Sequence, residues 1–407
     1  TCLAQSSHTR ESMPSLFSSA YPSQLGGVGS VPAGRTTLPE VLSSAGLATA
    51  GFHSNPYLSR AYTFDRGFDH FDDALSLASN RLVTLAHRVV NHFRNQPYLR
   101  AEALNEKGLE WLKDANTDRC FLWLHYMDPH GPYQPPEEYQ RLFREEIIGQ
   151  KRAKSLWRRT VDEPETITPA DRDVLIDLYD AEIRYADAML GKFLDTLDEH
   201  NLLSESIVVI GADHGDAFGE HGHYGHPRRV YEELVHVPLI VKMPDKRSAT
   251  VDRPVENLSI APTILDAFDI AVPDEFEGSS LLSREFGTND GKGATNRANS
   301  IEQVAVSEAT GESDDEGRRW TGIRSQTAEL HVVTDLASDE ILETSAYDLA
   351  TDPTESTPSK DDAVCEQLLG AYHDHRNRVG EQSAETEQPD DNIDPVVADR
   401  LEDLGYR

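Results

Sequence analysis

Cysteine and long apolar runs are scarce in this 407-residue chain. The three cysteines, Cys2, Cys120 and Cys365, lie far apart and are odd in number, which excludes a disulfide framework and a paired-cysteine metal site. No apolar run approaches the roughly 20 residues of a membrane-spanning helix. The first residues lack a methionine, a basic segment and an apolar segment, so we expect the natural start to lie upstream, and the lack of a signal peptide carries no information. A cytoplasmic location is the starting assumption, with export left open.

Basic residues are few as well. The chain has 38 Lys and Arg against 71 Asp and Glu, which gives a net charge of −33. A surface this acidic repels nucleic-acid phosphates and anionic lipid, so we expect neither as a partner. Acidic residues occur along the whole chain, and lysine is the rarer of the two basic types. This composition is typical of halophilic proteins, in which hydrated carboxylates keep the surface soluble at high salt; an ordinary acidic enzyme is the alternative.

Apolar strands alternate with helical segments along the chain. Apolar runs predict buried strands at residues 120–126, 207–212 and 237–241. Residues 168–200 show helical spacing of apolar residues after a Thr-Pro start signal. This alternation predicts an α/β fold with a mostly parallel sheet covered on both faces. Two of the three strands end in His and Asp clusters, and ligands of such sheets bind at the carboxyl ends of strands.

The sequence also predicts how the chain divides. We expect a catalytic α/β domain over residues 1–282, a mobile acidic loop over 283–315, and a small C-terminal α+β subdomain with a tail over 316–407. The loop range is rich in Gly, Ser, Asn and acidic residues, which favour mobility over packing. Short strand patterns within 316–350 indicate a small C-terminal sheet.

The strongest chemical signal follows the strand at 207–212. Residues 212–226 contain four histidines and three acidic residues. Carboxylate oxygens and imidazole nitrogens are ligands for divalent cations such as Ca²⁺, Zn²⁺ and Mn²⁺. Asp213 and His214 come first after the strand, and we predict that they bind a metal ion. A charged surface loop is the alternative interpretation, but it explains poorly an Asp-His pair directly after an apolar strand.

Residues 212–226 are similar to the second metal motif of sulfatases and related members of the alkaline phosphatase superfamily. Further segments resemble family motifs in the same order: residues 124–133, 229–240, 260–266 and 347–355. In the third of these, Ser259 and Ile260 stand where the family usually has Val-Asp. The resemblance implies a three-layer sandwich with a mostly parallel central sheet and a small C-terminal sheet. It also implies a metal-dependent hydrolase of sulfate or phosphate esters.

The resemblance places the nucleophile about twelve residues before a Tyr-Pro pair, and counting back from Tyr21 gives Thr9. Sulfatases have Cys or Ser there, in C/S-x-P-S-R, and oxidise it to formylglycine. Here Glu11 and Met13 replace the Pro and the Arg, so formylglycine is not expected. A Thr resembles the phosphoethanolamine transferases and Thr-using phosphodiesterases, and a metal-bound hydroxyl at a helix start can attack as an alkoxide. Thr9 is therefore the candidate nucleophile and a third metal ligand, and a plain N-cap is the alternative.

His130 and His226 are the candidates for contacting the ester oxygens or protonating the leaving group. The resemblance matches His130 to the substrate-contacting histidine of the family and His226 to a histidine of the transferases. An imidazolium can neutralise charge on a leaving oxygen. A hydrogen-bonded loop histidine is the alternative for each. Arg228 and Arg229 could clamp an anion, with a solvated turn as an equal alternative.

The family begins with a strand that ends in acidic metal ligands, well before the nucleophile. Only eight residues precede Thr9. We therefore expect the first strand of the sheet to be missing from this chain, together with its carboxylates, and metal affinity to be weak.

The leading interpretation is a sulfatase-family hydrolase that cleaves a sulfate or phosphate ester of a small molecule or glycan. The absence of the formylglycine motif favours a phosphate mono- or diester, whereas the family resemblance favours a sulfatase. A phosphodiesterase or phosphoethanolamine-type transferase is one alternative. A non-catalytic binding protein on the same fold is another. The sequence gives no signal of an oligomeric state.

Overall fold

The structure is a computed structural model that falls into two compact units. It describes residues 1–26, 29–74, 98–115, 117, 119–244, 250, 251, 253–282, 304–311, 315–359 and 361–380. The first unit contains Thr1–Leu38, Ser206–Ala217 and the described residues from His226 onward. The second unit contains the described residues of Pro39–Glu205 and Phe218–Gly225.

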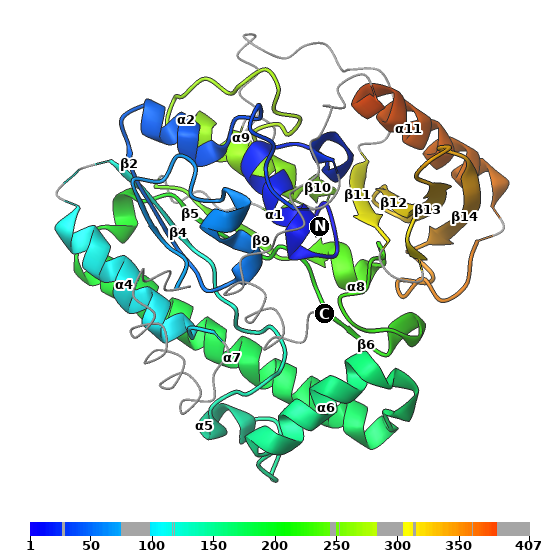
Figure 1. Cartoon of the computed structure of the whole chain (residues 1–407), viewed down its shortest axis with the longest axis horizontal. Coiled ribbons are helices and arrows are strands. Elements are labelled where there is room, and N and C mark those ends of the chain that lie inside the picture. The colour runs from blue at the N-terminus through cyan, green and yellow to red at the C-terminus, as the bar shows by residue number, and fades with distance from the viewer. Residues whose placement is uncertain are drawn as a thin grey trace. The chain divides into compact units, whose positions relative to one another are not determined.

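A three-stranded parallel sheet forms the centre of the second unit (Figure 1). Its strands are β2 (Ala48–Phe52), β3 (His70–Asp72) and β4 (Cys120–Leu124), in the order β3-β2-β4. Helix α4 (Ala101–Asp114) packs on β2 and β4. Buried side chains of β2 and α4, Phe52 and Leu104 among them, form the core between them. β4 confirms a strand at the position predicted at 120–126, but its residues are half-buried where a buried strand was predicted. The parallel sheet confirms the predicted α/β class.

Helix α7 (Pro169–Glu199) confirms the helix predicted over residues 168–200. Its first turn is fixed by a capping box, in which the Thr168 hydroxyl accepts from the Asp171 backbone N–H and the Asp171 carboxylate accepts from the Thr168 backbone N–H. The apolar side of the helix buries Leu175 and Leu178 against Trp157 of α6. The other described helices of this region are α2 (Leu38–Ser44), α5 (Glu137–Gln140) and α6 (Gln150–Asp162).

A buried ion cluster joins three segments of the second unit. Arg100 precedes α4, and its guanidinium lies 2.8 Å from Asp128 Oδ1 and 2.8 Å from Glu182 Oε2. Glu182 lies on α7, and both acidic side chains are fully buried. The backbone N–H of Ala101 also donates to Asp128 (2.8 Å). The Arg100 side chain therefore connects the start of α4 to the loop after β4 and to the middle of α7.

Short strands and helices of the first unit surround the N-terminal segment. β1 (Cys2–Leu3) runs parallel to β10 (Val255–Glu256) and antiparallel to β8 (His236–Val237). β5 (Val208–Gly211) pairs with β9 (Leu239–Lys242) in an antiparallel arrangement. The helices here are α1 (Thr9–Ser18), α8 (Glu232–Val235) and α9 (Ile260–Ala267). Two short strands, β6 (Ala217–Phe218) and β7 (Tyr224–Gly225), pair in the loop after β5, of which Phe218–Gly225 belong to the second unit.

β5 and β9 occupy the strand positions predicted at 207–212 and 237–241, but they are less buried than predicted. The residues of β5 are half-buried or exposed, and Ile240 of β9 is 57% exposed. The reason is that, within the described residues, each of these strands pairs with one strand only. An apolar run identifies a strand, but the number of its neighbours decides how deeply the strand is buried.

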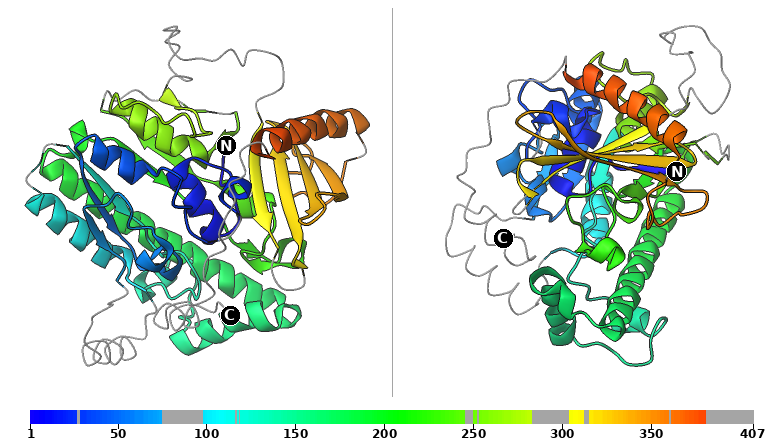
Figure 2. Two further views of the ribbon diagram at one scale, coloured as in Figure 1. Left: turned by 45° about the horizontal axis from the view of Figure 1, so that its top comes forward. Right: turned by 90° about the vertical axis from the view of Figure 1, so that its right-hand side faces the viewer.

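The C-terminal part of the first unit is an antiparallel meander covered by one helix (Figure 2). Its strands are β11 (Ala305–Thr310), β12 (Arg318–Arg324), β13 (Ala328–Asp335) and β14 (Ile341–Asp348), and the helix is α11 (Asp362–Gly380). The core between sheet and helix contains Ile323, Leu330, Leu368 and Tyr372. The predicted C-terminal sheet is therefore present.

One boundary of the predicted division is corrected. β11 lies inside the range 283–315, which we expected to be a loop. The polar residues Ser307 and Glu308 obscure the strand pattern in the sequence, yet both are buried because distant partners satisfy them. Residues 283–303 and the tail after 380 lie outside the described residues, so the remaining domain boundaries stay a prediction. None of the described helices is long and apolar enough to cross a membrane.

Replacing Arg100 with alanine tests the buried ion cluster. The change leaves the carboxylates of Asp128 and Glu182 without their shared cation, so we expect the free energy of unfolding to fall by about 3–5 kcal/mol. Urea unfolding at neutral pH measures the loss. Arg141→Ala is the matched control, because Arg141 forms only an exposed pair with Glu137 (3.6 Å), worth less than about 1 kcal/mol. Equal losses in the two variants would contradict this assignment.

A second prediction concerns the acid stability that Glu308 provides. Burial raises the pKa of Glu308, but the hydrogen bond and charge of His375 (2.8 Å) outweigh burial and lower the pKa to about 2. Because the folded pKa lies below the ordinary value of 4.5, this stabilisation is complete above pH 4.5 and is lost as the pH falls towards 2. The contribution is on the order of 3 kcal/mol.

We expect Glu308→Gln to flatten the decline in unfolding free energy between pH 4.5 and 2. Urea unfolding at several pH values in this range measures the slope. Glu366→Gln, which removes an exposed carboxylate from α11, is the control and should keep the slope of the parent chain. A Glu308→Gln chain with an unchanged slope would show that another carboxylate controls acid unfolding.

Candidate active site

Thr9 is the first residue of α1 and is almost fully buried. Its hydroxyl donates to Asp213 Oδ2 (2.7 Å) and lies 3.3 Å from His214 Nε2. His214 Nε2 lies 3.7 Å from the same Asp213 oxygen. The three residues that the sequence analysis selected as metal ligands therefore converge on one point, although Thr9 and Asp213 are 204 positions apart in the chain.

The loop after β5 is held in place by hydrogen bonds to its backbone. The Ser12 hydroxyl donates to the carbonyl of Asp213 (2.6 Å), and the Asn257 side chain donates to the carbonyl of Ala212 (2.9 Å). Gly215 is required by packing, because a Cβ at this position would lie 2.1 Å from the carbonyl oxygen of Glu233. Asp213 and His214 thus emerge from a backbone that α1 and its neighbours fix on both sides.

His8, not Thr9, caps the helix. The backbone of His8 is extended, and its Nδ1 accepts from the backbone N–H of Arg10 (3.2 Å). The alternative role of Thr9 as the N-cap is therefore corrected: its hydroxyl is engaged by Asp213 and does not bond to the helix backbone. Because His8 caps the helix, the Thr9 oxygen lies at the positive end of the helix dipole without being used as the cap.

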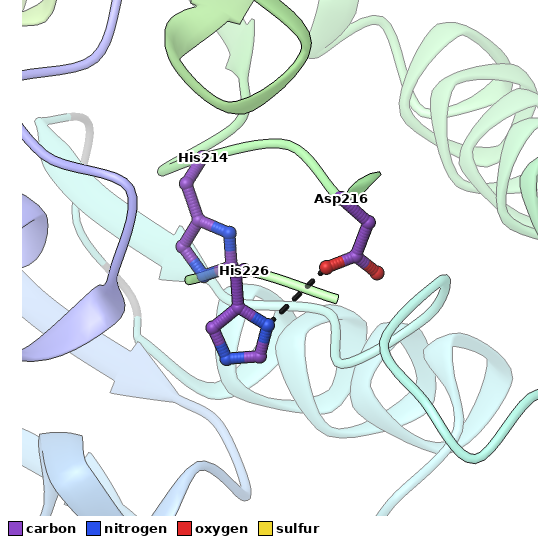
Figure 3. A group of neighbouring side chains, drawn as sticks. All are labelled: His214, Asp216 and His226. Atoms are coloured by element: carbon purple, nitrogen blue, oxygen red, sulfur yellow. Dashed lines mark hydrogen bonds and ion pairs between the residues drawn. The ribbon is translucent and has the colours of Figure 1, made fainter. Parts of the chain in front are cut away.

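Hydrogen bonds fix the ring orientation of two histidines. His214 Nδ1 lies 2.9 Å from the carbonyl of Gly215 and so carries the proton, which leaves Nε2 as an acceptor facing Thr9. His226 Nδ1 lies 3.2 Å from Asp216 Oδ1, so the carboxylate of Asp216 fixes the orientation of the His226 ring (Figure 3). A carboxylate or carbonyl behind an imidazole is the usual support of a metal-binding histidine.

The histidines lie close together in this site. The His214 and His226 rings stack with centroids 4.7 Å apart, and the His8 ring lies 5.2 Å from that of His226. Burial lowers the pKa of His226 more than the bond to Asp216 raises it, which favours the neutral ring. Potential ligand atoms of His214, Asp216 and His226 lie within 4.8 Å of one another. The donor set of nitrogen and carboxylate oxygen fits a divalent cation, with Asp216 placed to orient His226.

A buried ion pair supports the start of α1. Glu11 occupies the position of the motif proline, and its carboxylate accepts from Arg228 Nη1 (2.8 Å) and from Ser6 Oγ (2.6 Å). Arg229 pairs with Asp315 (2.5 Å) and lies over the Trp320 ring at 4.0 Å. Both arginines therefore have acidic partners within the first unit, which does not match the solvated turn considered as an alternative.

His130 belongs to the second unit, where its Nδ1 lies 2.6 Å from the carbonyl of Gly131 and its ring lies 6.2 Å from Trp157. Its expected contact with substrate stays a prediction. The sequence analysis did not identify the roles of His8, Ser12 and Asp216. Two signals were present: a histidine directly before Thr9, and an acidic residue within the loop that carries His226.

Comparison with known proteins decides the family. The sequence model described as Sulfatase matches residues 3–270, more than half of the chain, and the one described as N-sulphoglucosamine sulphohydrolase, C-terminal, matches residues 219–382. The chain belongs to the sulfatase family. This family lies in the alkaline phosphatase superfamily and normally uses a metal ion.

Similar proteins include both sulfatases and phosphonate hydrolases. An arylsulfatase of Clostridium perfringens is 29% identical over 193 residues, which cover 43% of this chain and 39% of the relative. The phosphonate monoester hydrolase of Agrobacterium radiobacter has a TM-score of 0.69 at 16% identity, covering 94% of this chain and 88% of the other. A protein solved with its substrate D-glucosamine-2-N,6-O-disulfate has a TM-score of 0.68 at 17% identity, covering 95% and 91%.

These structures confirm the sulfatase-like α/β fold of the family member described here. The matches span less than half the length of the curated relatives.

Asp216→Asn tests the support of His226. An amide cannot polarise the Nδ1–H as a carboxylate does, so we expect Mn²⁺ or Zn²⁺ affinity of the sulfatase-family site to fall about 10- to 100-fold. Isothermal titration of the metal-free chain measures the change. Asp195→Asn, on the exposed side of α7, is the control and should leave the affinity unchanged. Unchanged affinity in Asp216→Asn would show that His226 does not ligate the ion.

Proposed function

We propose that this chain is a metal-dependent ester hydrolase in which Thr9 is the nucleophile. The observation that supports this best is the convergence of Thr9 Oγ1 with Asp213 Oδ2 at 2.7 Å and with His214 Nε2 at 3.3 Å. A buried hydroxyl at a helix start, beside a carboxylate and an imidazole acceptor, is arranged for nucleophilic attack. An N-cap or packing role alone would not need these two partners.

The residues of the chain have separate tasks in this proposal. Thr9, Asp213 and His214 would hold a divalent ion of the Ca²⁺, Zn²⁺ or Mn²⁺ type, and Asp216 orients the His226 ring, which stacks on the ring of His214. A bound ion would lower the pKa of the Thr9 hydroxyl and polarise the ester. The carboxylate of Asp213 orients the Thr9 oxygen through their hydrogen bond and accepts the proton of the hydroxyl.

The reaction then follows from the positions of these groups. Thr9 Oγ1 forms a bond to the phosphorus or sulfur atom, and the bond from that atom to the alcohol oxygen breaks. His130 and His226 are the proposed groups that contact the ester oxygens or protonate the departing alcohol. Because burial favours the neutral ring of His226, we assign the ester contact to His226 and the proton donation to His130. Water then cleaves the Thr9 ester and restores the hydroxyl.

The nucleophile favours a phosphorus ester as the substrate. Thr9 cannot become formylglycine, and Glu11 with its Arg228 partner replaces the proline of the formylglycine motif. A plain hydroxyl lacks the hydrate-elimination route that releases sulfate from formylglycine. We therefore propose a phosphate or phosphonate ester of a small molecule or glycan, with sulfate esters as the second class. A phosphodiesterase or phosphoethanolamine-type transferase fits the same Thr9 chemistry.

Replacing Thr9 tests this function. We expect Thr9→Ala to lower kcat/KM for nitrophenyl phosphate at least about 1,000-fold, because no oxygen remains to attack. Thr9→Ser should keep part of the activity, and Thr344→Ala, on an exposed part of β14, is the control. Parallel assays with bis-nitrophenyl phosphate and nitrophenyl sulfate identify the ester class. The net charge of −33 makes molar KCl the appropriate medium for a halophilic protein.

Mass spectrometry of quenched reactions should find the phosphoryl group on Thr9. Turnover by Thr9→Ala equal to that of the parent would overturn the nucleophile. Binding of the esters without turnover would favour a non-catalytic binding protein.

A further inference from the structure

A second cluster of metal-ligand side chains lies in the C-terminal sheet of the first unit. Glu329 and His331 point to the same side of β13, and Glu355 follows β14. His331 Nε2 lies 3.2 Å from Glu355 Oε1 and 3.4 Å from Glu329 Oε1. All three side chains are buried, with residue exposures of 0% for Glu329, 2% for Glu355 and 6% for His331. We call these residues the β13 cluster.

The facing atoms of the β13 cluster are not satisfied by hydrogen bonds. Glu329 Oε1, His331 Nε2 and Glu355 Oε1 are all buried, and none makes a hydrogen bond of good geometry with any residue that the structure describes. Their contacts with one another are ion pairs of 3.2 Å and 3.4 Å that lack hydrogen-bond geometry. Buried polar atoms that are satisfied this poorly are costly, so their arrangement requires an explanation. A ligand at their centre would satisfy all three.

The spacing of these atoms suits a metal ion. Tetrahedral zinc, with bonds of about 2.0–2.1 Å, separates its ligand atoms by about 3.3 Å. The two observed separations are 3.2 Å and 3.4 Å. We propose that Glu329, His331 and Glu355 bind a divalent ion of the zinc class at a site separate from Thr9. One imidazole and two carboxylates are a donor set that such ions accept.

The outer oxygens of the two carboxylates are held by neighbours. Arg324 Nη1 lies 3.4 Å from Glu329 Oε2, and the backbone N–H of Glu232 donates to Glu355 Oε2 (2.8 Å). These contacts leave the Oε1 atoms turned inward. Outer contacts that orient the ligands are a general property of metal sites.

The surroundings of the cluster provide room and access. Gly322 lies opposite His331 on β12, and a Cβ there would stand 2.9 Å from Glu329 Oε1. His331 also lines a cavity of about 190 Å³ together with Tyr231, Trp320 and Tyr347. The cavity therefore reaches the edge of the β13 cluster at His331, where it leaves space for water beside the imidazole. The site would link β13 to the Glu355 loop and to α8 through Glu232.

Metal analysis of an active-site variant tests this proposal. Asp213→Ala with His214→Ala removes two ligands of the candidate active site. After removal of metal with a chelator, dialysis against Zn²⁺ and elemental analysis, we expect this variant to retain one equivalent of zinc. Adding His331→Leu should abolish that equivalent, and His373→Leu, at an exposed position of α11, should not. Zinc should raise the thermal midpoint by a few degrees only where His331 is present.

Two further variants keep the test decisive if His331→Leu fails to fold. Glu355→Gln keeps the shape of the side chain and should weaken zinc binding at least 10-fold. Gly322→Ala leaves every ligand in place but crowds Glu329 Oε1, and it should weaken binding in the same direction. The proposal is overturned if the active-site variant retains no zinc, or if its zinc survives Glu355→Gln and Gly322→Ala unchanged. Either result would mean that a protonated His331 bridges the two carboxylates without an ion.

Discussion

The hydrogen bond between Thr9 and Asp213 is the contact on which the candidate active site depends. It joins the first turn of α1 to the end of β5, two segments separated by 204 positions in the chain. The loop after β5 supplies Asp213 and the adjacent His214, and α1 supplies the hydroxyl together with the positive end of a helix. Neither element alone brings a carboxylate acceptor, an imidazole and a hydroxyl to one point.

The electrostatic support of this contact differs from that of the formylglycine motif. Glu11 stands where the motif has proline, and Arg228 balances its charge from a segment 217 positions away. The pair anchors the helix start without using Thr9, so the hydroxyl remains committed to Asp213 and His214. The threonine at position 9 and the buried Glu11-Arg228 pair are therefore two connected departures from the same motif, and together they support the proposal of direct attack by a hydroxyl.

Some of this architecture could be predicted from the sequence because its causes are local. The Thr168-Pro169 start and the apolar spacing after it define α7, and an apolar strand followed by Asp213-His214 defines one side of the site. Hydrogen bonds and ion pairs between buried polar side chains that lie far apart in the sequence could not be predicted. The sequence around Glu308 does not show that this residue of β11 contacts His375. A strand that contains a buried acidic residue therefore has the sequence pattern of a loop.

Buried carboxylates show how a strongly acidic chain balances charge in its interior. Each of three such acids contacts a basic group: Glu11 meets Arg228, Glu182 meets Arg100 and Glu308 meets His375. Isolated buried charge is too costly to persist, so this pairing is expected. The β13 cluster departs from it, because His331 faces two carboxylates and Arg324 is shared between Glu329 and Glu232. A divalent cation would restore there the balance that single basic groups provide elsewhere.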